Sequence, residues 1–182
     1  MKKKLIIFDF DGTIVDISLF YPYFNELADK YGFDKIEDIE KARHMCSNEL
    51  IKNQKIPKLV VPRIIKEISE RSKERIDEVE PNEGMVEAIK RISKRHELAI
   101  LSSNIEENIR FFLRKYDMDV FDFVIGYPKL FGKSTALKKI MKRRNLRPEE
   151  IVYVGDEVRD LEATQKAGIE FVGVSWGLNS KE

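Results

Sequence analysis

The chain has 182 residues, which is enough for one ordinary domain or for a compact core that carries a small insertion. Its 33 basic and 32 acidic residues give a formal net charge of +1, which excludes a global electric field that would attract nucleic acid or an anionic membrane. The single cysteine, Cys46, cannot form an internal disulfide, and no segment approaches the roughly 20 apolar residues of a membrane span. The first apolar run stops at Asp9, too early for a signal peptide, so we expect a cytoplasmic protein without a nucleic-acid or membrane partner.

The first predicted element is a buried strand that ends in two acidic residues. Residues 5–8 are apolar and rich in β-branched and aromatic side chains, and Asp9 and Asp11 follow with one residue between them. Gly12 lets the backbone turn sharply, and Thr13 adds a hydroxyl. We expect these acids at the carboxyl end of a strand in an open α/β sheet, where such folds bind ligands.

Residues 17–80 are predicted to form helices only. A first helix has apolar residues at spacings of three and four and a glycine as its stop. These residues are Phe20, Phe24, Leu27, Tyr31 and Gly32. A second helix fits within residues 36–53, and a third begins near a proline and continues along an apolar face. The residues of this third helix are Pro57 or Pro62, followed by Ile64, Ile65, Ile68 and Ile76.

Residues 80–84 mark a boundary, because they combine a proline, a possible helix N-cap and a glycine. Helices and strands alternate from there on. The predicted helices lie near residues 83–95, 105–116, 133–145 and 160–167, and the predicted strands are residues 98–101, 121–125, 151–154 and 170–174. Such alternation is typical of a parallel sheet covered by helices. We therefore predict a doubly wound α/β core, residues 1–16 and 81–182, that carries an all-helical insertion, residues 17–80.

Polar residues also follow the later strands. Ser102 comes directly after residues 98–101, Ser103 is its close alternative, and Asn104 is a possible helper. A hydroxyl beside free backbone amides at a helix start can bind a phosphoryl oxygen. A simple helix N-cap is the other interpretation, because serine and asparagine favour that position.

Lys133 opens the helix predicted at residues 133–145. Cations are usually better placed at the carboxyl end of a helix, so this position favours a functional role such as contact with a phosphate. We interpret the further basic residues of this helix as a solvated face rather than a nucleic-acid surface. They are Lys138, Lys139, Lys142, Arg143 and Arg144.

The strand at residues 151–154 again ends in acids, Asp156 and Asp160, with Glu157 expected to point outward. In chain order, the four polar segments resemble the four motifs of the haloacid dehalogenase-like superfamily. They are residues 9–13 in the phosphotransfer form Asp-x-Asp-Gly-Thr, residues 102–104, Lys133, and residues 155–160 in the form Gly-Asp-x-x-x-Asp. The resemblance extends over residues 4–15 and 82–178, and it implies a Rossmann-like core with a helical cap inserted behind the first motif.

The resemblance also implies a role for each candidate residue. Asp9 would be the nucleophile that forms an aspartyl phosphate, and Asp11 would act as general acid and base. Dehalogenating relatives lack this second acid, so its presence favours phosphorus chemistry. The residues implied in phosphate binding are Gly12, Thr13, Ser102, Ser103, Asn104 and Lys133. Mg²⁺ would be held by Asp9, the backbone carbonyl of Asp11, and Asp156, while Asp160 would lie behind them and orient Lys133 or a metal-bound water.

These residues predict a Mg²⁺-dependent phosphatase of a small phosphorylated metabolite. Residues 174–180 and the fourth motif most resemble the phosphoglycolate phosphatase-like branch, so 2-phosphoglycolate is one possible substrate. Three alternatives remain. The same core could serve a sugar phosphomutase, a phosphonatase with a cap lysine, or a non-catalytic binding or regulatory protein, including a nucleic-acid binder through the basic helix.

The helical cap would exclude water and select the leaving group. Its charge is nearly balanced, so a large polyanionic substrate is not indicated. The candidate cap contacts are Arg43, His44, Lys52 and the aromatic residues Phe20, Tyr21, Tyr23 and Phe24. For the aromatic residues, packing inside the protein is the preferred interpretation.

Overall fold

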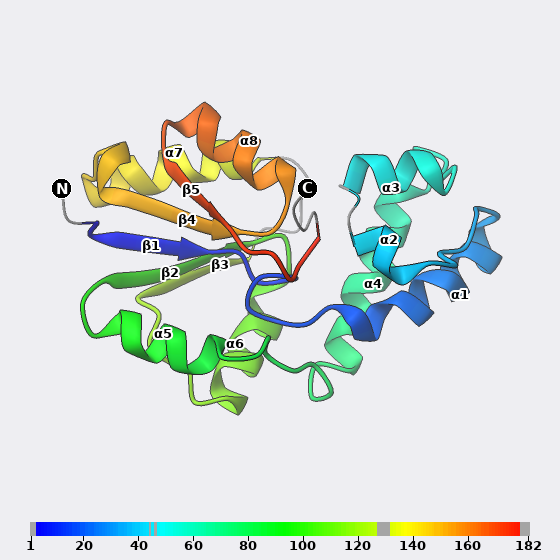
Figure 1. The fold of residues 1–182 in the computed structure, drawn as a ribbon, viewed down its shortest axis with the longest axis horizontal. Coiled ribbons are helices and arrows are strands. Elements are labelled where there is room, and N and C mark those ends of the chain that lie inside the picture. Colours follow the sequence, from blue (N-terminus) through cyan, green and yellow to red (C-terminus); the bar gives the residue numbers. More distant parts are fainter. Residues whose placement is uncertain (1–2, 44, 46, 127–131, 179–182) are drawn as a thin grey trace.

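The fold is built on one parallel β-sheet. The computed structural model describes residues 3–43, 45, 47–126 and 132–178 (Figure 1). Five strands lie in the order β3-β2-β1-β4-β5, and every neighbouring pair is parallel. Their bounds are β1 (Leu5–Phe8), β2 (Glu97–Ser102), β3 (Phe123–Gly126), β4 (Ile151–Gly155) and β5 (Glu170–Gly173). The predicted α/β class is thus confirmed.

The first strand occupies the middle of this sheet. In β1, Leu5 lies opposite Glu97 of β2 on one side and opposite Ile151 of β4 on the other. The order of the strands reverses beside β1, and open α/β sheets bind their ligands beyond the carboxyl ends of the strands at such a point. The position of β1 therefore brings the acids that follow it to the expected binding edge.

Helices cover both faces of the sheet. Helices α5 (Met85–Ser93) and α6 (Glu106–Lys115) lie on one face, and α7 (Lys133–Arg144) and α8 (Val158–Ala167) lie on the other (Figure 1). Successive side chains of a strand point to opposite faces, so β1 contributes to both apolar cores. Leu5 packs with the α7 and α8 side, whereas Phe8 packs with the α5 and α6 side.

The helical insertion gathers beyond the carboxyl ends of the strands (Figure 1). Its helices are α1 (Tyr21–Tyr31), α2 (Ile39–Arg43), α3 (Ser47–Asn53) and α4 (Val61–Glu74), after a short 3₁₀ turn, η1 (Ser18–Phe20). They enclose an apolar cluster of their own, which includes Phe24, Leu27 and Ile64. None of the described helices combines the length and the apolar character that crossing a bilayer requires.

Two details of the helical prediction were wrong, whereas the glycine stop is confirmed. Gly32 ends α1 with a φ of +71°, a left-handed conformation that glycine adopts without strain. The single helix predicted within residues 36–53 is two short helices. The third helix ends at Glu74, and Ile76 belongs instead to the core cluster that also contains Phe8. The sequence pattern does not distinguish an isoleucine on a helix of the insertion from one in the core, because the side chain is buried in both cases.

The chain leaves and re-enters the core at one place. The amide of Asp16 donates to the carbonyl of Glu80 over 2.9 Å, and Val15 forms a bridge with Pro81. Asn82 adds a side-chain hydrogen bond of 3.1 Å to the carbonyl of Thr13. The two connections therefore lie side by side at the predicted boundary.

Candidate active site

Three strand ends bring the predicted site residues together. Asp9 and Asp11 follow β1, Ser102 ends β2, and Asp156 follows β4. Phe10 anchors the segment between the two acids, because its ring is 1% exposed and packs edge to face with Phe112 at a centroid distance of 5.2 Å. Since the anchored backbone cannot move freely, the positions of both carboxylates are fixed by the core.

The side chain of Asp11 contacts residues at the end of β2 and directly after it. Its Oδ1 accepts a hydrogen bond of 2.8 Å from Asn104 Nδ2, and its Oδ2 lies 3.4 Å from the Ser102 hydroxyl. Burial, followed by the negative charge of Asp9, raises the pKa of Asp11 from 3.8 to about 6. Ser102 is buried against Asp11 whereas Ser103 is partly exposed, so Ser102 is the serine that faces this acid.

Lys133, the first residue of α7, forms two buried ion pairs. Its Nζ lies 2.7 Å from Asp9 Oδ2 and 2.6 Å from Asp160 Oδ1. Burial alone disfavours the ammonium form, but Asp9 and Asp160 outweigh it and raise the pKa of Lys133 well above its ordinary value. Lys133 is therefore a fixed positive charge, held against the acid at the end of β1.

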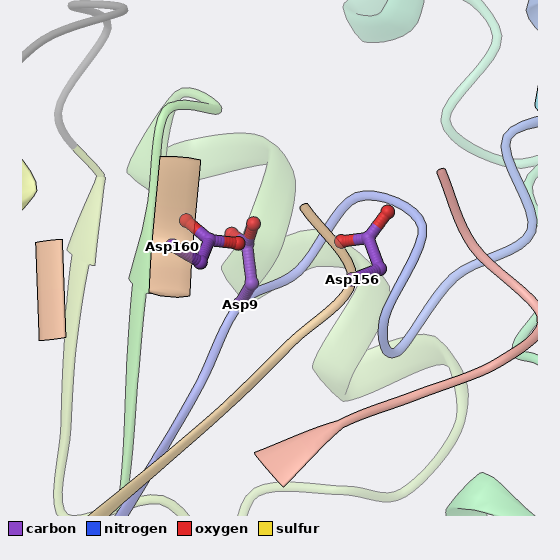
Figure 2. Close-up of side chains that lie close together, drawn as sticks. All are labelled: Asp9, Asp156 and Asp160. Carbon is purple, nitrogen blue, oxygen red and sulfur yellow. The ribbon is translucent and has the colours of Figure 1, made fainter. Parts of the chain in front are cut away.

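Three buried carboxylates form a cluster that includes both acids paired with this lysine. Asp9, Asp156 and Asp160 each offer a carboxylate oxygen, and these oxygens lie within 4.8 Å of one another (Figure 2). Figure 2 shows the carboxyl groups of Asp9 and Asp160 facing one another, with Asp156 on the other side of Asp9. Burial is the main cause that raises the pKa of Asp156 well above its ordinary value and that of Asp160 to about 7.

The donor set of this cluster fits a divalent cation. Carboxylate oxygens are hard ligands of the kind that Mg²⁺ and Ca²⁺ prefer. Among the described residues, Asp160 Oδ2 is buried and has no hydrogen-bond partner. A cation close to these acids would favour their ionised forms and lower their pKa values. The side chain of Asp11 is not part of the cluster, since it turns toward Ser102 and Asn104.

Gly12 and Thr13, which were expected to bind phosphate, lie against Asp156. The Thr13 hydroxyl, fully buried, donates to Asp156 Oδ1 over 3.0 Å. Gly12 has a φ of +75°, and a Cβ at this position would come within 2.2 Å of Asp156 Oδ2. The turn therefore packs directly against the Asp156 carboxylate, and only a glycine at position 12 leaves room for this contact.

Sequence reasoning missed Tyr153 and misjudged Glu157. Tyr153 is fully buried, donates to the Leu101 carbonyl over 2.9 Å, and presents its ring 5.5 Å below the Lys133 ammonium. In the sequence it resembles any apolar strand residue, so no local signal identifies it. Glu157 does not point outward as expected. It is 6% exposed and forms an ion pair of 2.6 Å with Arg159.

The candidate cap contacts divide into four groups. Tyr21 and Phe24 are buried in the apolar cluster of the helical insertion, and Tyr23 packs against that cluster, as the packing interpretation predicts. Phe20 packs against the core cluster instead. Lys52 is exposed. The remaining candidates, His44 and the side chain of Arg43, lie outside the part of the chain that the structure describes.

Comparisons with known proteins agree with this geometry. Residues 6–174 match the model of the haloacid dehalogenase-like hydrolase family. The phosphoglycolate phosphatase of Synechococcus elongatus is 29% identical over 184 residues, which cover 98% of this chain and 87% of that protein. The phosphorylated carbohydrates phosphatase of Thermotoga maritima is 29% identical over 197 residues, with coverages of 97% and 87%.

A solved structure shows the same fold. The haloacid dehalogenase-like hydrolase of Streptococcus pneumoniae superposes with a TM-score of 0.79 at 18% identity, covering 98% of this chain and 88% of that one. The match to the family extends over most of the chain, and it includes the strand ends that carry Asp9, Ser102 and Asp156. The chain therefore belongs to the haloacid dehalogenase-like hydrolase family.

Proposed function

We propose that this haloacid dehalogenase-like phosphatase hydrolyses a small phosphorylated metabolite in a Mg²⁺-dependent reaction. The observation that carries the proposal is the separation of its first two acids. Asp9 lies against Lys133 in the carboxylate cluster, whereas Asp11 lies outside the cluster and is hydrogen-bonded by Asn104 and Ser102. Two acids in such different surroundings suit two different tasks, attack and proton transfer.

Asp9 is the proposed nucleophile. One of its carboxylate oxygens forms a bond to phosphorus, the bond between phosphorus and the leaving oxygen breaks, and an aspartyl phosphate results. Asp11 gives its proton to the leaving oxygen and then accepts a proton from the water that hydrolyses the intermediate. A pKa of about 6 for Asp11 suits this exchange, since both of its forms are accessible near neutral pH.

Lys133 and the residues after β2 are proposed to hold the transferred phosphoryl group. The Lys133 ammonium, already at Asp9, offsets the negative charge that gathers when two anionic groups meet. The hydroxyls of Ser102 and Ser103 and the amide group of Asn104 lie between the end of β2 and the start of α6, and the N-terminus of a helix favours an anion. Gly12 and Thr13 contribute indirectly, through their contacts with Asp156.

Asp9, the backbone carbonyl of Asp11, and Asp156 are the proposed ligands of Mg²⁺. When bound, the cation supplies charge neutralisation between the carboxylate and the phosphate ester. Asp160 is assigned to the positioning of Lys133, because its Oδ1 already pairs with the ammonium.

Residues 1–16 and 81–182 are proposed as the catalytic core, and residues 17–80 as a cap that selects the substrate. The cap lies beyond the strand ends that carry the acids, so it can close over a bound ester and exclude bulk water (Figure 1). The relatives named above act on phosphoglycolate and on phosphorylated carbohydrates. Small phosphomonoesters, with 2-phosphoglycolate among them, are therefore the first substrates to examine.

A phosphate-release screen with Mg²⁺ and a panel of metabolite esters tests this proposal. The wild type should release phosphate from at least one small ester, and Asp9→Asn should abolish the release while the protein remains folded. A folded Asp9→Asn variant with wild-type turnover would disprove the mechanism. Isomerised product instead of free phosphate would identify a mutase.

A further inference from the structure

The segment that follows β5 returns to the carboxylate cluster. Residues 175–178, called the C-terminal strap below, come after Val174, whose amide donates to the Gly155 carbonyl over 3.0 Å. In Figure 1 this red segment runs beside the blue loop that follows β1, on the side that faces the helical insertion. The strap therefore reaches the same edge of the sheet as the acids.

One contact of the strap is made directly with Asp156. The backbone amide of Leu178 donates to Asp156 Oδ2 over 2.8 Å. Gly177 is buried beside it, and a Cβ at this position would lie 2.4 Å from Asp156 Cβ and 2.4 Å from the Gly12 carbonyl. No other residue fits there without displacing either the carboxylate or the turn.

A second contact ties the strap to the turn that holds the other oxygen of Asp156. Trp176 Nε1 donates to the Thr13 carbonyl over 3.0 Å, and the Thr13 hydroxyl donates to Asp156 Oδ1 over 3.0 Å. Asn82, at the boundary with the helical insertion, donates to the same Thr13 carbonyl over 3.1 Å. Asp156 is thus held through both of its oxygens, once by Thr13 and once by the strap.

We infer that the C-terminal strap is a positioning element that fixes the Asp156 carboxylate for a divalent cation. The inference rests on the proposed function in one respect, namely that Asp156 is a cation ligand. Groups that hydrogen-bond a metal ligand set its orientation, and their removal typically weakens the metal affinity by roughly 10- to 100-fold. In this chain the group is a backbone amide, brought to the carboxylate by a glycine that leaves room for it.

A matched pair of substitutions at one position tests the inference. Leu178→Pro removes the N–H group that donates to Asp156. Leu178→Ala shortens the side chain but keeps this N–H group. The dissociation constant is measured directly, with Mn²⁺ by electron paramagnetic resonance and with Mg²⁺ by calorimetry. We expect it to rise about tenfold or more in Leu178→Pro. We expect Leu178→Ala to stay within about twofold of the wild type, because the hydrogen bond to Asp156 is retained.

Two more variants protect the test against misfolding of the proline variant. Gly177→Ala introduces the Cβ that meets Asp156, and Trp176→Phe keeps a ring but removes the donor to Thr13. Melting temperatures identify which variants are folded. Every folded member among Leu178→Pro, Gly177→Ala and Trp176→Phe should bind Mn²⁺ more weakly than the wild type, with Trp176→Phe affected least. Wild-type affinity in the folded variants overturns the inference.

The kinetic dependence on Mg²⁺ separates positioning from a general structural role. If the strap acts through Asp156, the half-saturating Mg²⁺ concentration should rise in Gly177→Ala, and kcat at saturating Mg²⁺ should recover most of the wild-type value. An unchanged half-saturating Mg²⁺ concentration together with a lower kcat contradicts the inference. Its failure is distinguishable from failure of the proposed function, since wild-type phosphate release tests the latter alone.

Discussion

The ammonium of Lys133 lies 2.7 Å from Oδ2 of Asp9, across 124 positions of the sequence. Asp9 is buried, the Lys133 side chain is only 10% exposed, and the other oxygen of Asp9 accepts a hydrogen bond of 2.8 Å from the amide of Phe10. The acid proposed as the nucleophile is therefore held through both oxygens and paired with a cation before any ester arrives.

Lys133→Met should destabilise the protein as well as inactivate it. The substitution leaves Asp9 and Asp160 buried without their cation, and breaking a buried ion pair in this way costs about 3–5 kcal/mol. Denaturant unfolding without divalent cation measures the loss. Lys138→Met, at an exposed position of the same helix, is the control and should change the stability by less than about 0.5 kcal/mol. Equal stabilities of the two variants would contradict the assignment of Lys133 to a buried pair.

Asp11→Asn should lower the rate of hydrolysis far more for esters with poor leaving groups than for esters with good ones. An alkyl alcohol needs a proton as it leaves, whereas p-nitrophenolate leaves without one. Loss of a general acid typically lowers the rate by about 10²- to 10⁴-fold for a substrate with such a poor leaving group. Comparison of kcat/KM for an alkyl phosphate and for p-nitrophenyl phosphate gives the ratio. The same loss with both substrates points to a role other than protonation.

The pH dependence of the wild type follows from the same acid. The pKa of Asp11 is raised to about 6, so the protonated form needed for leaving-group departure is abundant below that pH and declines tenfold per unit above it. The pKa is measured in the wild type from kcat/KM for an alkyl phosphate as a function of pH. We expect the alkaline limb to be absent with p-nitrophenyl phosphate. A matching alkaline limb with both esters assigns that limb to another group.

Divalent cation should stabilise the fold through the carboxylate cluster. Asp9, Asp156 and Asp160 bring carboxylate oxygens within 4.8 Å of one another, and a ligand that binds the folded state alone stabilises it by about 2.7 kcal/mol at 100 times its Kd. Mg²⁺ should therefore raise the melting temperature, and chelation should reverse the rise. Asp156→Asn should reduce the shift, with exposed Asp117→Asn as the matched control. A full shift in Asp156→Asn excludes this carboxylate as a ligand.

Glu150 should contribute to acid stability at the opposite edge of the sheet. Its hydrogen bond from Lys4 and the amide of Arg147 lower the pKa of Glu150 from 4.5 to about 2. A carboxyl group with a lowered pKa stabilises the folded state above its unfolded-state value, and this contribution is lost as the pH falls from about 4.5 toward 2. Glu150→Gln should flatten the decline in stability over that range, as followed by denaturant unfolding at a series of pH values. An unchanged slope shows that other acids govern the decline.

Much of the fold could be predicted because local patterns report burial. The run at residues 5–8 indicated a strand, and Gly32 indicated the end of a helix, since each follows from its neighbours along the chain. Ile76 was misplaced because apolar spacing records only that a side chain is buried. Whether it is buried in the helical insertion or in the core depends on where α4 ends.

By itself the sequence determined which acids stand at strand ends, and hence the family and the class of chemistry. Only the tertiary structure decided which oxygen meets which donor. Thr13 reaches Asp156 across 143 positions of the chain, and the amide of Leu178 carries no side-chain signal at all. Strand ends follow from local periodicity, whereas the orientation of a buried carboxylate depends on close packing between segments that are distant in the sequence.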